Sequence, residues 1–231
     1  MYCFLDYRVT EEEINNLIKQ NINPIIVPRT TKVYEGINGH VDIQLSVIGK
    51  NKVIVHKSIS PAFLEELTQN NIEFIFSSED LGMSYPYDII LNGLVLENYF
   101  IHNLKFTDKI LLKTQSNKKL INVKQGYTKC SVLPLGEKIA ITSDNGIYHA
   151  LIAEGFDVLL IPPGDIVLPS MNYGFIGGVG GMISDNKLAL FGDLSSYKYG
   201  NDVRMFLSKY KIEVLSLKNG KLTDRGSLLL I

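Results

Sequence analysis

Hydrophobic and polar positions follow a rhythm along this chain that repeats every forty to fifty residues or so. Each repeat holds a strand pair or one long bent strand, a helix of about three turns, and a short returning strand. The first complete repeat has an apolar strand at 52–56 and returns as a strand at 72–76. Between them a helix starts with Ser60 as its N-cap and Pro61 in its first turn, as helix starts favour. The pattern predicts a mixed α/β repeat protein.

Three more repeats are complete within the chain. The second is predicted to contain segments 88–92 and 99–102, a helix from Thr107 and a strand at 120–123. The third is predicted to contain strands at 129–132, 138–142 and 157–161, with a helix that Ser143 or Asp144 caps and Gly155 ends. The fourth is predicted to contain segment 175–183, strands at 187–191 and 213–217, and a helix near 202–209.

A fifth repeat forms only when the two ends of the chain are combined. Residues 222–231 and 2–7 each supply a strand, a capping box at 10–13 starts a helix, and residues 24–27 close the repeat. Sharing one repeat between the termini closes a ring and removes an exposed sheet edge. We therefore expect one domain over residues 1–231, an α/β propeller of five units with pseudo-fivefold symmetry. An open α/β fold is the alternative, because periodicity does not fix topology.

The amino-acid composition bears on which molecules the protein binds and on where in the cell it is expected. The 23 Lys and Arg residues nearly balance the 24 Asp and Glu residues, so no nucleic acid is expected to bind. Two cysteines among 231 residues fit a reducing cytoplasm and cannot form a multi-bridge framework. The N-terminus lacks a signal-peptide pattern, and the uncharged stretch 166–184 holds Pro169, Asn172 and five glycines. We expect a cytoplasmic protein with no membrane segment.

The segment Gly39-His40-Val41-Asp42 carries the sharpest candidate chemistry. If it is a strand, His40 and Asp42 point to the same face, where an imidazole that moves protons lies beside a carboxylate that can hold a cation. The alternative for an isolated pair of this kind is an exposed or capping histidine in a turn.

Cys130 is predicted to begin a strand, which would turn the adjacent Lys129 to the opposite face. Its alternative role, and the expected role of Cys3, is that of a small buried hydrophobe. The glycine-rich run at 174–182 matches neither a P-loop nor a dinucleotide fingerprint, and is interpreted as a strand crowded against the centre of the ring. No histidine has a second metal ligand at a diagnostic spacing, so neither a metal nor a cofactor is expected.

Five units, a His-x-Asp segment, an Asn in the next unit and a Cys in the one after resemble the guanidino-group-modifying, or pentein, superfamily. The segments that start at Gly39, Gly126 and Gly174 together resemble a bacterial branch of this fold. The resemblance implies that Cys130 is the nucleophile, His40 the acid and base, and Asp42 one clamp for a planar cation. Asn92, in the segment 88–93, is similar to the intervening unit of the family.

The repeat order departs from the family, because two units follow Cys130 whereas the family places its cysteine near the C-terminus. The order resembles a circular permutation, which a ring of similar units tolerates. The segment 175–181 offers no acid, and Asp224 is a poorly matched substitute in the last unit. Arg8 is interpreted either as a ligand for a substrate carboxylate or as a surface ion pair.

Two functions follow from this resemblance. One is a cysteine-dependent hydrolase or transferase that acts on a small guanidino or amidino compound. The other is a noncatalytic pentein-fold binding protein, which the missing acids at 175–181 favour. The expected ligand in either case is a small cation.

Overall fold

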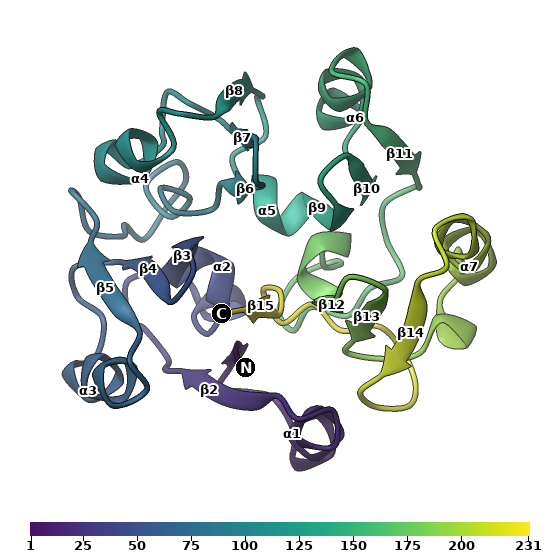
Figure 1. Ribbon diagram of the computed structural model, residues 1–231, viewed down its shortest axis with the longest axis horizontal. Helices are drawn as coiled ribbons and strands as arrows, with labels where there is room; N and C mark the ends of the chain where they lie inside the picture. Colours follow the sequence, from purple (N-terminus) through teal and green to yellow (C-terminus); the bar gives the residue numbers. More distant parts are fainter.

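The computed structural model describes residues 1–231, whose strands form five separate three-stranded sheets arranged as a ring (Figure 1). In every sheet the inner strand runs antiparallel to the middle strand, and the middle strand runs parallel to the outer one. The parallel pair needs a crossover, and a helix supplies it in each unit. The predicted five-unit α/β propeller is therefore confirmed.

The strands fall into three concentric sets. The inner strands are β15 (Leu229–Leu230), β3 (Leu45–Gly49), β6 (Leu94–Val95), β9 (Val132–Gly136) and β12 (Gly180–Ser184). The middle strands are β1 (Tyr2–Asp6), β4 (Lys52–Val55), β7 (Tyr99–His102), β10 (Ile139–Thr142) and β13 (Lys187–Leu190). The outer strands are β2 (Asn23–Val27), β5 (Glu73–Phe76), β8 (Lys119–Asn122), β11 (Asp157–Leu160) and β14 (Glu213–Ser216).

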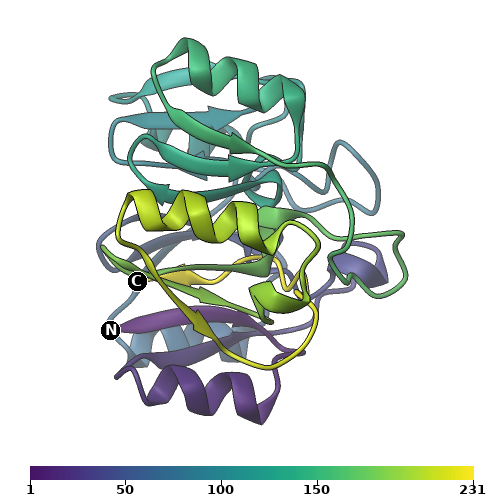
Figure 2. The same cartoon turned by 90° about the vertical axis from the view of Figure 1, so that its right-hand side faces the viewer.

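The crossover helices lie on the outside of the ring, as Figure 2 shows for α6, α7 and α1. They are α1 (Glu11–Ile18), α3 (Pro61–Gln69), α4 (Lys109–Thr114), α6 (Asn145–Ala153) and α7 (Gly200–Lys209). Their starts follow local capping chemistry: Thr10 and Glu13 form the predicted capping box, and Asp144 caps α6 through its side chain. Gly155 takes a positive φ of 75° just after α6, as predicted for a residue that ends a helix.

The two ends of the chain meet in one sheet. β15 pairs antiparallel with β1, with Cys3 opposite Leu230 and Phe4 opposite Leu229. Both termini lie at the same end of the ring axis, on the left in Figure 2. Buried side chains of neighbouring units pack against each other: Leu133 and Ile141 of one unit join Leu188 and Leu190 of the next in one cluster. Each unit is thus held through the side chains of its neighbours.

Three segments that the sequence pattern predicted as strands are helical turns instead. His40 precedes the short helix α2 (Val41–Gln44), and Cys130 lies in α5 (Thr128–Ser131) rather than at the start of a strand. The glycine run forms the 3-10 helix η2 (Ile176–Val179) before β12 begins. Segment 88–92 is a turn. Two further 3-10 helices, η1 (Glu35–Ile37) and η3 (Leu194–Ser196), lie in connections.

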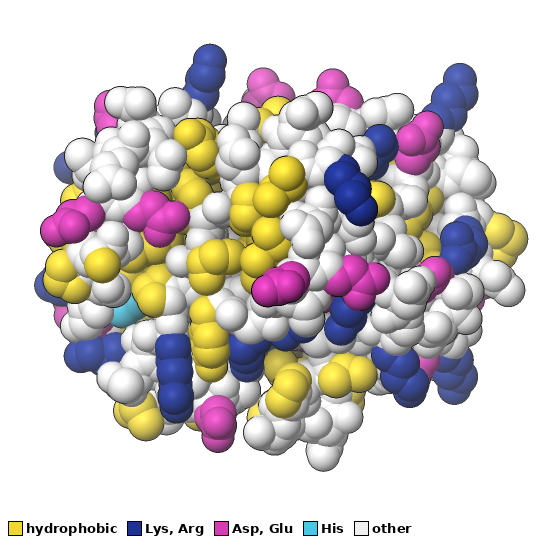
Figure 3. Space-filling view, turned by 90° about the horizontal axis from the view of Figure 1, so that it is seen from below, with side chains coloured by type: hydrophobic (Ala, Val, Ile, Leu, Met, Phe, Trp, Pro, Cys, Tyr) yellow, Lys and Arg dark blue, Asp and Glu magenta, His cyan; other side chains and the backbone are white.

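No helix in the structure is both long enough and apolar enough to cross a membrane. Figure 3 shows acidic and basic side chains spread together with hydrophobic ones over the side of the molecule near α1 and α3.

Candidate active site

The inner strands are each preceded by a short turn, and these turns bring the candidate residues together. Asp42 lies in α2 before β3, Asn92 in the turn before β6, Cys130 in α5 before β9, and Asp224 in the segment before β15. All four side chains are buried. Because the five units are related by the ring, equivalent positions in different units converge on the axis. The ring explains how Asp42 and Ser227, which are 185 positions apart in the chain, come into contact.

Cys130 is held on three sides by hydrogen bonds. Its thiol lies 3.2 Å from Oδ1 of Asp42 and can donate to it, and its Sγ accepts from Nδ2 of Asn92 at 3.1 Å. Oδ1 of Asn92 accepts the backbone N–H of Cys130 at 3.2 Å, and Nδ2 of Asn92 also donates to the backbone carbonyl of Asp42. Asn92 therefore fixes the turn that carries the thiol to the turn that carries the carboxylate.

His40 completes the cluster. One ring nitrogen of His40, one carboxylate oxygen of Asp42 and Sγ of Cys130 all lie within 4.8 Å of one another. Nε2 of His40 lies 3.8 Å from Oδ1 of Asp224. The imidazole is 1 % exposed, and neither of its ring nitrogens has a hydrogen-bond partner within the protein. An imidazole without partners is free to accept or donate a proton to a bound molecule.

Burial is the largest cause of the pKa shifts of His40, Asp224 and Cys130. It lowers the pKa of His40 to about 4 and raises the pKa of Asp224 to about 6. Burial also raises the pKa of the Cys130 thiol well above its usual range, and the nearby Asp42 and Asp224 raise it further. The hydrogen bond from Asn92 acts in the opposite direction. At neutral pH the site therefore holds a neutral imidazole and a neutral thiol.

The glycine run explains why its unit contributes no acid. A Cβ on Gly178 would lie 1.8 Å from Oδ1 of Asp224, and a Cβ on Gly177 would lie 2.2 Å from the backbone oxygen of Lys129. Asp224 in turn accepts the backbone N–H groups of Phe175 and Gly226. The unit of the glycine run thus has no acid of its own and leaves space for Asp224 of the neighbouring unit. The sequence pattern did not indicate this arrangement.

Lys129 and Ser227 are buried polar residues that the sequence analysis did not place in the site. Nζ of Lys129 donates to Oγ of Ser227 at 2.7 Å and to the carbonyl of Gly177 at 3.3 Å. Oγ of Ser227 lies 2.6 Å from Oδ2 of Asp42 and donates to it or to the same carbonyl. Because Lys129 is in a helix, its side chain is not forced away from the axis as it would be next to Cys130 on a strand.

Asp6 is a further acid of the site that sequence reasoning passed over. It is fully buried at the end of β1, and its charge acts on His40. Arg8 donates from Nε and Nη2 to the Asp6 carboxylate and from Nη1 to the carbonyl of Gly36. The contacts of Arg8 match the ion-pair interpretation, with a buried rather than a surface carboxylate as its partner. The signal available in the sequence was a carboxylate that directly ends an apolar strand.

Aromatic side chains pack against the hydrophobic cluster that contains Cys130. Tyr34, Tyr127 and Phe175 belong to the same hydrophobic cluster as Cys130. The hydroxyl of Tyr127 donates to Asp88 at 2.5 Å and lies 3.5 Å from that of Tyr34. The ring of Tyr127 lies 6.1 Å from that of Phe175. Cys130 itself is only 2 % exposed.

The remaining histidines have other roles. His56 contacts Asp80 and Gln44, whereas His102 contacts Thr107 and the carbonyl of Gly126. His149 is exposed on α6. The cluster whose donor atoms could together hold a metal ion is His40, Asp42 and Cys130. Its imidazole, carboxylate and thiol would suit a borderline metal such as zinc. The sequence predicted these three residues as a catalytic set and not as metal ligands, because their spacing in the chain matches no metal motif.

Similar folds occur among enzymes that modify guanidino groups. An amidinotransferase of the saxitoxin biosynthetic pathway from Microseira wollei shares 9 % identity at a TM-score of 0.57, over 97 % of this chain and 89 % of that one. A DDAH mutant from Pseudomonas aeruginosa in complex with citrulline shares 8 % identity at a TM-score of 0.53, over 93 % and 91 %. An agmatine deiminase from C. jejuni shares 10 % identity at a TM-score of 0.52, over 94 % and 87 %. These proteins have the pentein fold, and the predicted resemblance of fold is confirmed.

Sequence comparison gives a separate result. No curated protein matches the chain at a significant level. Residues 4–229 match DUF6873, which is described as a family of unknown function. Since that match spans almost the entire sequence and agrees with the extent of the five-unit ring, the protein belongs to the DUF6873 family.

Proposed function

We propose that this protein is a cysteine-dependent hydrolase or transferase that acts on a small guanidino or amidino compound. The observation that carries the proposal is the convergence of a His40 nitrogen, an Asp42 oxygen and Cys130 Sγ within 4.8 Å. A nucleophile, a proton carrier and an acid that can bind a cation are the groups this reaction requires. The enzymes of similar fold named above act on guanidino groups, which supports the same reacting group here.

In this proposal a planar cation lies between Asp42 and Asp224, which accept hydrogen bonds from its N–H groups. Cys130 is the nucleophile, and His40 carries the proton. Asn92 positions Cys130 through its contacts with Sγ and the backbone N–H. Arg8 holds Asp6, so its part in the site is to fix a buried carboxylate near His40.

The pKa of the Cys130 thiol, and therefore its reactivity, depends on whether a cation is bound beside it. Without a cation, burial and two carboxylates keep the pKa of Cys130 high, and the thiol is unreactive. A bound cation offsets the charge of Asp42 and Asp224 and favours the thiolate. Because His40 is neutral, it can accept the thiol proton as the sulfur attacks.

The proposed reaction balances in two steps. Sγ of Cys130 bonds to the central carbon of the amidino group while the thiol proton passes to His40, and the C–N bond to the leaving amine breaks as His40 returns that proton to its nitrogen. Water in a hydrolase, or an acceptor amine in a transferase, then attacks the same carbon and gives a proton to His40. The C–S bond breaks, and the proton from His40 restores the thiol.

A noncatalytic binding protein of the same fold is the second candidate. The observation that favours it is the thiol itself, which is buried and whose pKa is raised. Such a protein would use Asp42 and Asp224 to bind a cation and would leave Cys130 unmodified.

Alkylation with matched probes separates the two functions. 2-Chloroacetamidine is a planar cation, and 2-chloroacetamide is its neutral counterpart of nearly the same size. With a chelator present, the enzyme proposal expects the cationic probe to label Cys130 much faster than the neutral probe does, and to leave Cys3 unmodified. Peptide mapping by mass spectrometry locates the label.

Variants test each role in the same assay. His40→Ala should lose the fast labelling, and Asp42→Asn should weaken the preference for the cationic probe. Methylguanidine should compete with the cationic probe for Asp42 and Asp224 and so slow the reaction of that probe with Cys130, whereas a nucleotide should not, because no phosphate-binding motif is present. Slow labelling of both cysteines at equal rates by both probes would contradict the enzyme and leave the binding protein.

A further inference from the structure

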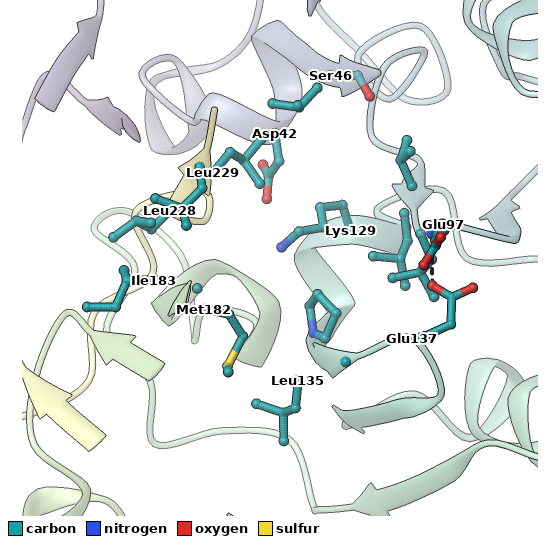
Figure 4. A pocket seen from close by; sticks show the side chains of 18 of the residues that line it. Asp42, Ser46, Glu97, Lys129, Leu135, Glu137, Met182, Ile183, Leu228 and Leu229 are labelled. Atoms are coloured by element: carbon teal, nitrogen blue, oxygen red, sulfur yellow. Dashed lines mark hydrogen bonds between the residues drawn. The ribbon is translucent and has the colours of Figure 1, made fainter. Parts of the chain in front are cut away.

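A cavity lies on the ring axis and reaches Asp42 of the candidate active site. It is a cavity of about 750 Å³ lined by residues of all five inner strands and of the exposed N-terminal Met1. Fourteen of its 25 lining residues are hydrophobic, and Figure 4 shows Leu135, Met182 and Ile183 around it. Ligand pockets in proteins commonly measure about 300 to 1,000 Å³ and are mostly apolar with a few polar groups. We call this cavity the axial channel. It has the size and the mostly apolar lining of a small-molecule site.

The axial channel reaches two charged residues at its inner end, Asp42 and Lys129, and both point toward its centre in Figure 4. It is not lined by His40 or Cys130. Asp42 is thus the residue that the axial channel shares with the cluster of His40, Asp42 and Cys130.

The inner end offers both a hydrogen-bond donor and acceptors. Nζ of Lys129 has three N–H groups, and the protein supplies two acceptors, Oγ of Ser227 and the carbonyl of Gly177. Oδ1 of Asp42 lies within hydrogen-bond distance of the Cys130 thiol, and Oδ2 lies within that distance of the Ser227 hydroxyl, so each oxygen can accept a further hydrogen bond. A molecule that ends here can satisfy Lys129 and Asp42 together.

The outer part of the axial channel is acidic. Glu97, Glu137 and Asp185 line it, and the carboxylate of Glu137 accepts the backbone N–H groups of Glu97 and Asn98. Lys129, at the inner end, is the one Lys or Arg among the lining residues. This distribution of charge disfavours the entry of an anion.

We propose that the axial channel binds an elongated molecule with an apolar body and an uncharged head group that both donates and accepts hydrogen bonds, as a primary carboxamide or a urea does. The N–H groups of the head donate to Asp42, its carbonyl accepts from Lys129, and the body lies along the apolar walls. The site goes beyond the proposed catalytic function and does not depend on it.

Other head groups leave one of the two charged residues without a partner. A carboxylate would accept from Lys129 but would lie beside Asp42 and pass three acidic side chains. An ammonium would donate to Asp42 but would lie beside Lys129. A purely apolar molecule would desolvate both, which costs free energy because buried charges need hydrogen-bond partners.

The test is a series of ligands with the same six-carbon chain: hexanamide, hexylurea, hexanoate and hexylammonium. Their affinities are measured by chemical-shift titration of the ¹⁵N-labelled protein. Hexanamide and hexylurea should bind about tenfold more tightly than either charged ligand, since one mispaired buried hydrogen bond costs about 1.4 kcal/mol. Equal affinity for all four ligands, or binding by none, would overturn the proposal.

Two tryptophan variants locate the site, because the natural chain has no tryptophan. Met182→Trp should fill the axial channel and abolish amide binding, whereas Met205→Trp, at a 66 % exposed position on α7, should leave it unchanged. If Met182→Trp does not fold, the ligand series in the natural chain still decides the question. Cys130→Ser should bind hexanamide normally, so a failure of the catalytic proposal is distinguishable from a failure of this one.

Discussion

Cys3 and Cys130 provide two thiols that are equally hidden from solvent but differ in what surrounds them. Cys3 lies in β1 among apolar side chains such as Leu5 and Phe191, and burial alone raises its pKa to about 12. Cys130 lies among Asp42, Asn92 and Asp224, and carboxylates contribute to its raised pKa. Burial of Cys3 is a fixed property of the fold, whereas a ligand can neutralise charge around Cys130. We therefore expect a bound cation to change the reactivity of Cys130 and to leave that of Cys3 unchanged.

The largest effect is expected where the fold itself holds Cys130 in place. Gly177→Ala would bring a Cβ within 2.5 Å of the backbone oxygens of Lys129, Cys130 and Val132, which cannot rotate away. We expect a loss of about 3 kcal/mol in the free energy of unfolding. Gly49→Ala is the matched control, because nothing lies within 4 Å of its added Cβ. Chemical denaturation measures both, and equal stability of the two variants would refute the packing around Cys130.

The next effect concerns pH. The raised pKa of Asp224 gives stability that is complete below about pH 3.8 and lost as the pH rises through about 6. The lowered pKa of His40 gives the opposite, a contribution present above about pH 6.5 and lost as the pH falls through about 4. In the natural chain these two dependences offset each other between pH 4 and 6.

Substituting one of the two residues at a time should reveal the pH dependence of stability that the other one contributes. Relative to the natural chain, Asp224→Asn should gain about 2 kcal/mol of unfolding free energy as the pH rises from 4 to 6. His40→Gln should lose a similar amount over the same interval. Denaturation at several pH values measures both differences, and parallel profiles for all three proteins would show that neither group is buried as described.

A smaller effect is expected from removing one negative charge beside Cys130. No effect of this substitution is expected at Cys3. Asp42→Asn removes a carboxylate that raises the pKa of the Cys130 thiol, so this pKa should fall by about one unit, a tenfold change in thiolate fraction. Cys3 should not change. The pH dependence of iodoacetamide alkylation at each cysteine measures the shift, and an unchanged Cys130 would mean that burial alone controls it.

The smallest effect is expected at Asn92. Asn92→Ala removes the hydrogen bond that favours the thiolate of Cys130, so its pKa should rise further and its alkylation should slow about threefold. Asn92→Asp keeps an oxygen that can accept the backbone N–H of Cys130 but adds a carboxylate beside the thiol, so its alkylation should slow more than in Asn92→Ala. A faster reaction in Asn92→Ala would contradict the assigned hydrogen bond.

Elements with local signals could be predicted from the sequence. The capping box of Thr10 and Glu13, the cap at Asp144 and the left-handed Gly155 all depend on neighbouring residues, and each was found where expected. The repeating order of strand, helix and strand similarly predicted the five units. These features need no knowledge of distant contacts.

The short helices α2 and α5 could not be predicted, because four residues carry too little periodicity to distinguish a helical turn from a strand. Lys129 and Ser227 were missed for a different reason. Their place in the site depends on how separate units meet at the axis, and nothing in their local sequence reports that meeting.

The most direct measurement of the central claim is the pKa of each thiol with and without a planar cation. Iodoacetamide alkylation of the natural chain would be followed at Cys3 and Cys130 across pH, in the presence and absence of methylguanidine. If a cation lowers the pKa of Cys130 by offsetting the charge of Asp42 and Asp224, its alkylation midpoint should fall by about one unit or more without full protection, while that of Cys3 stays constant. Identical midpoints for Cys130 in both conditions would contradict the account.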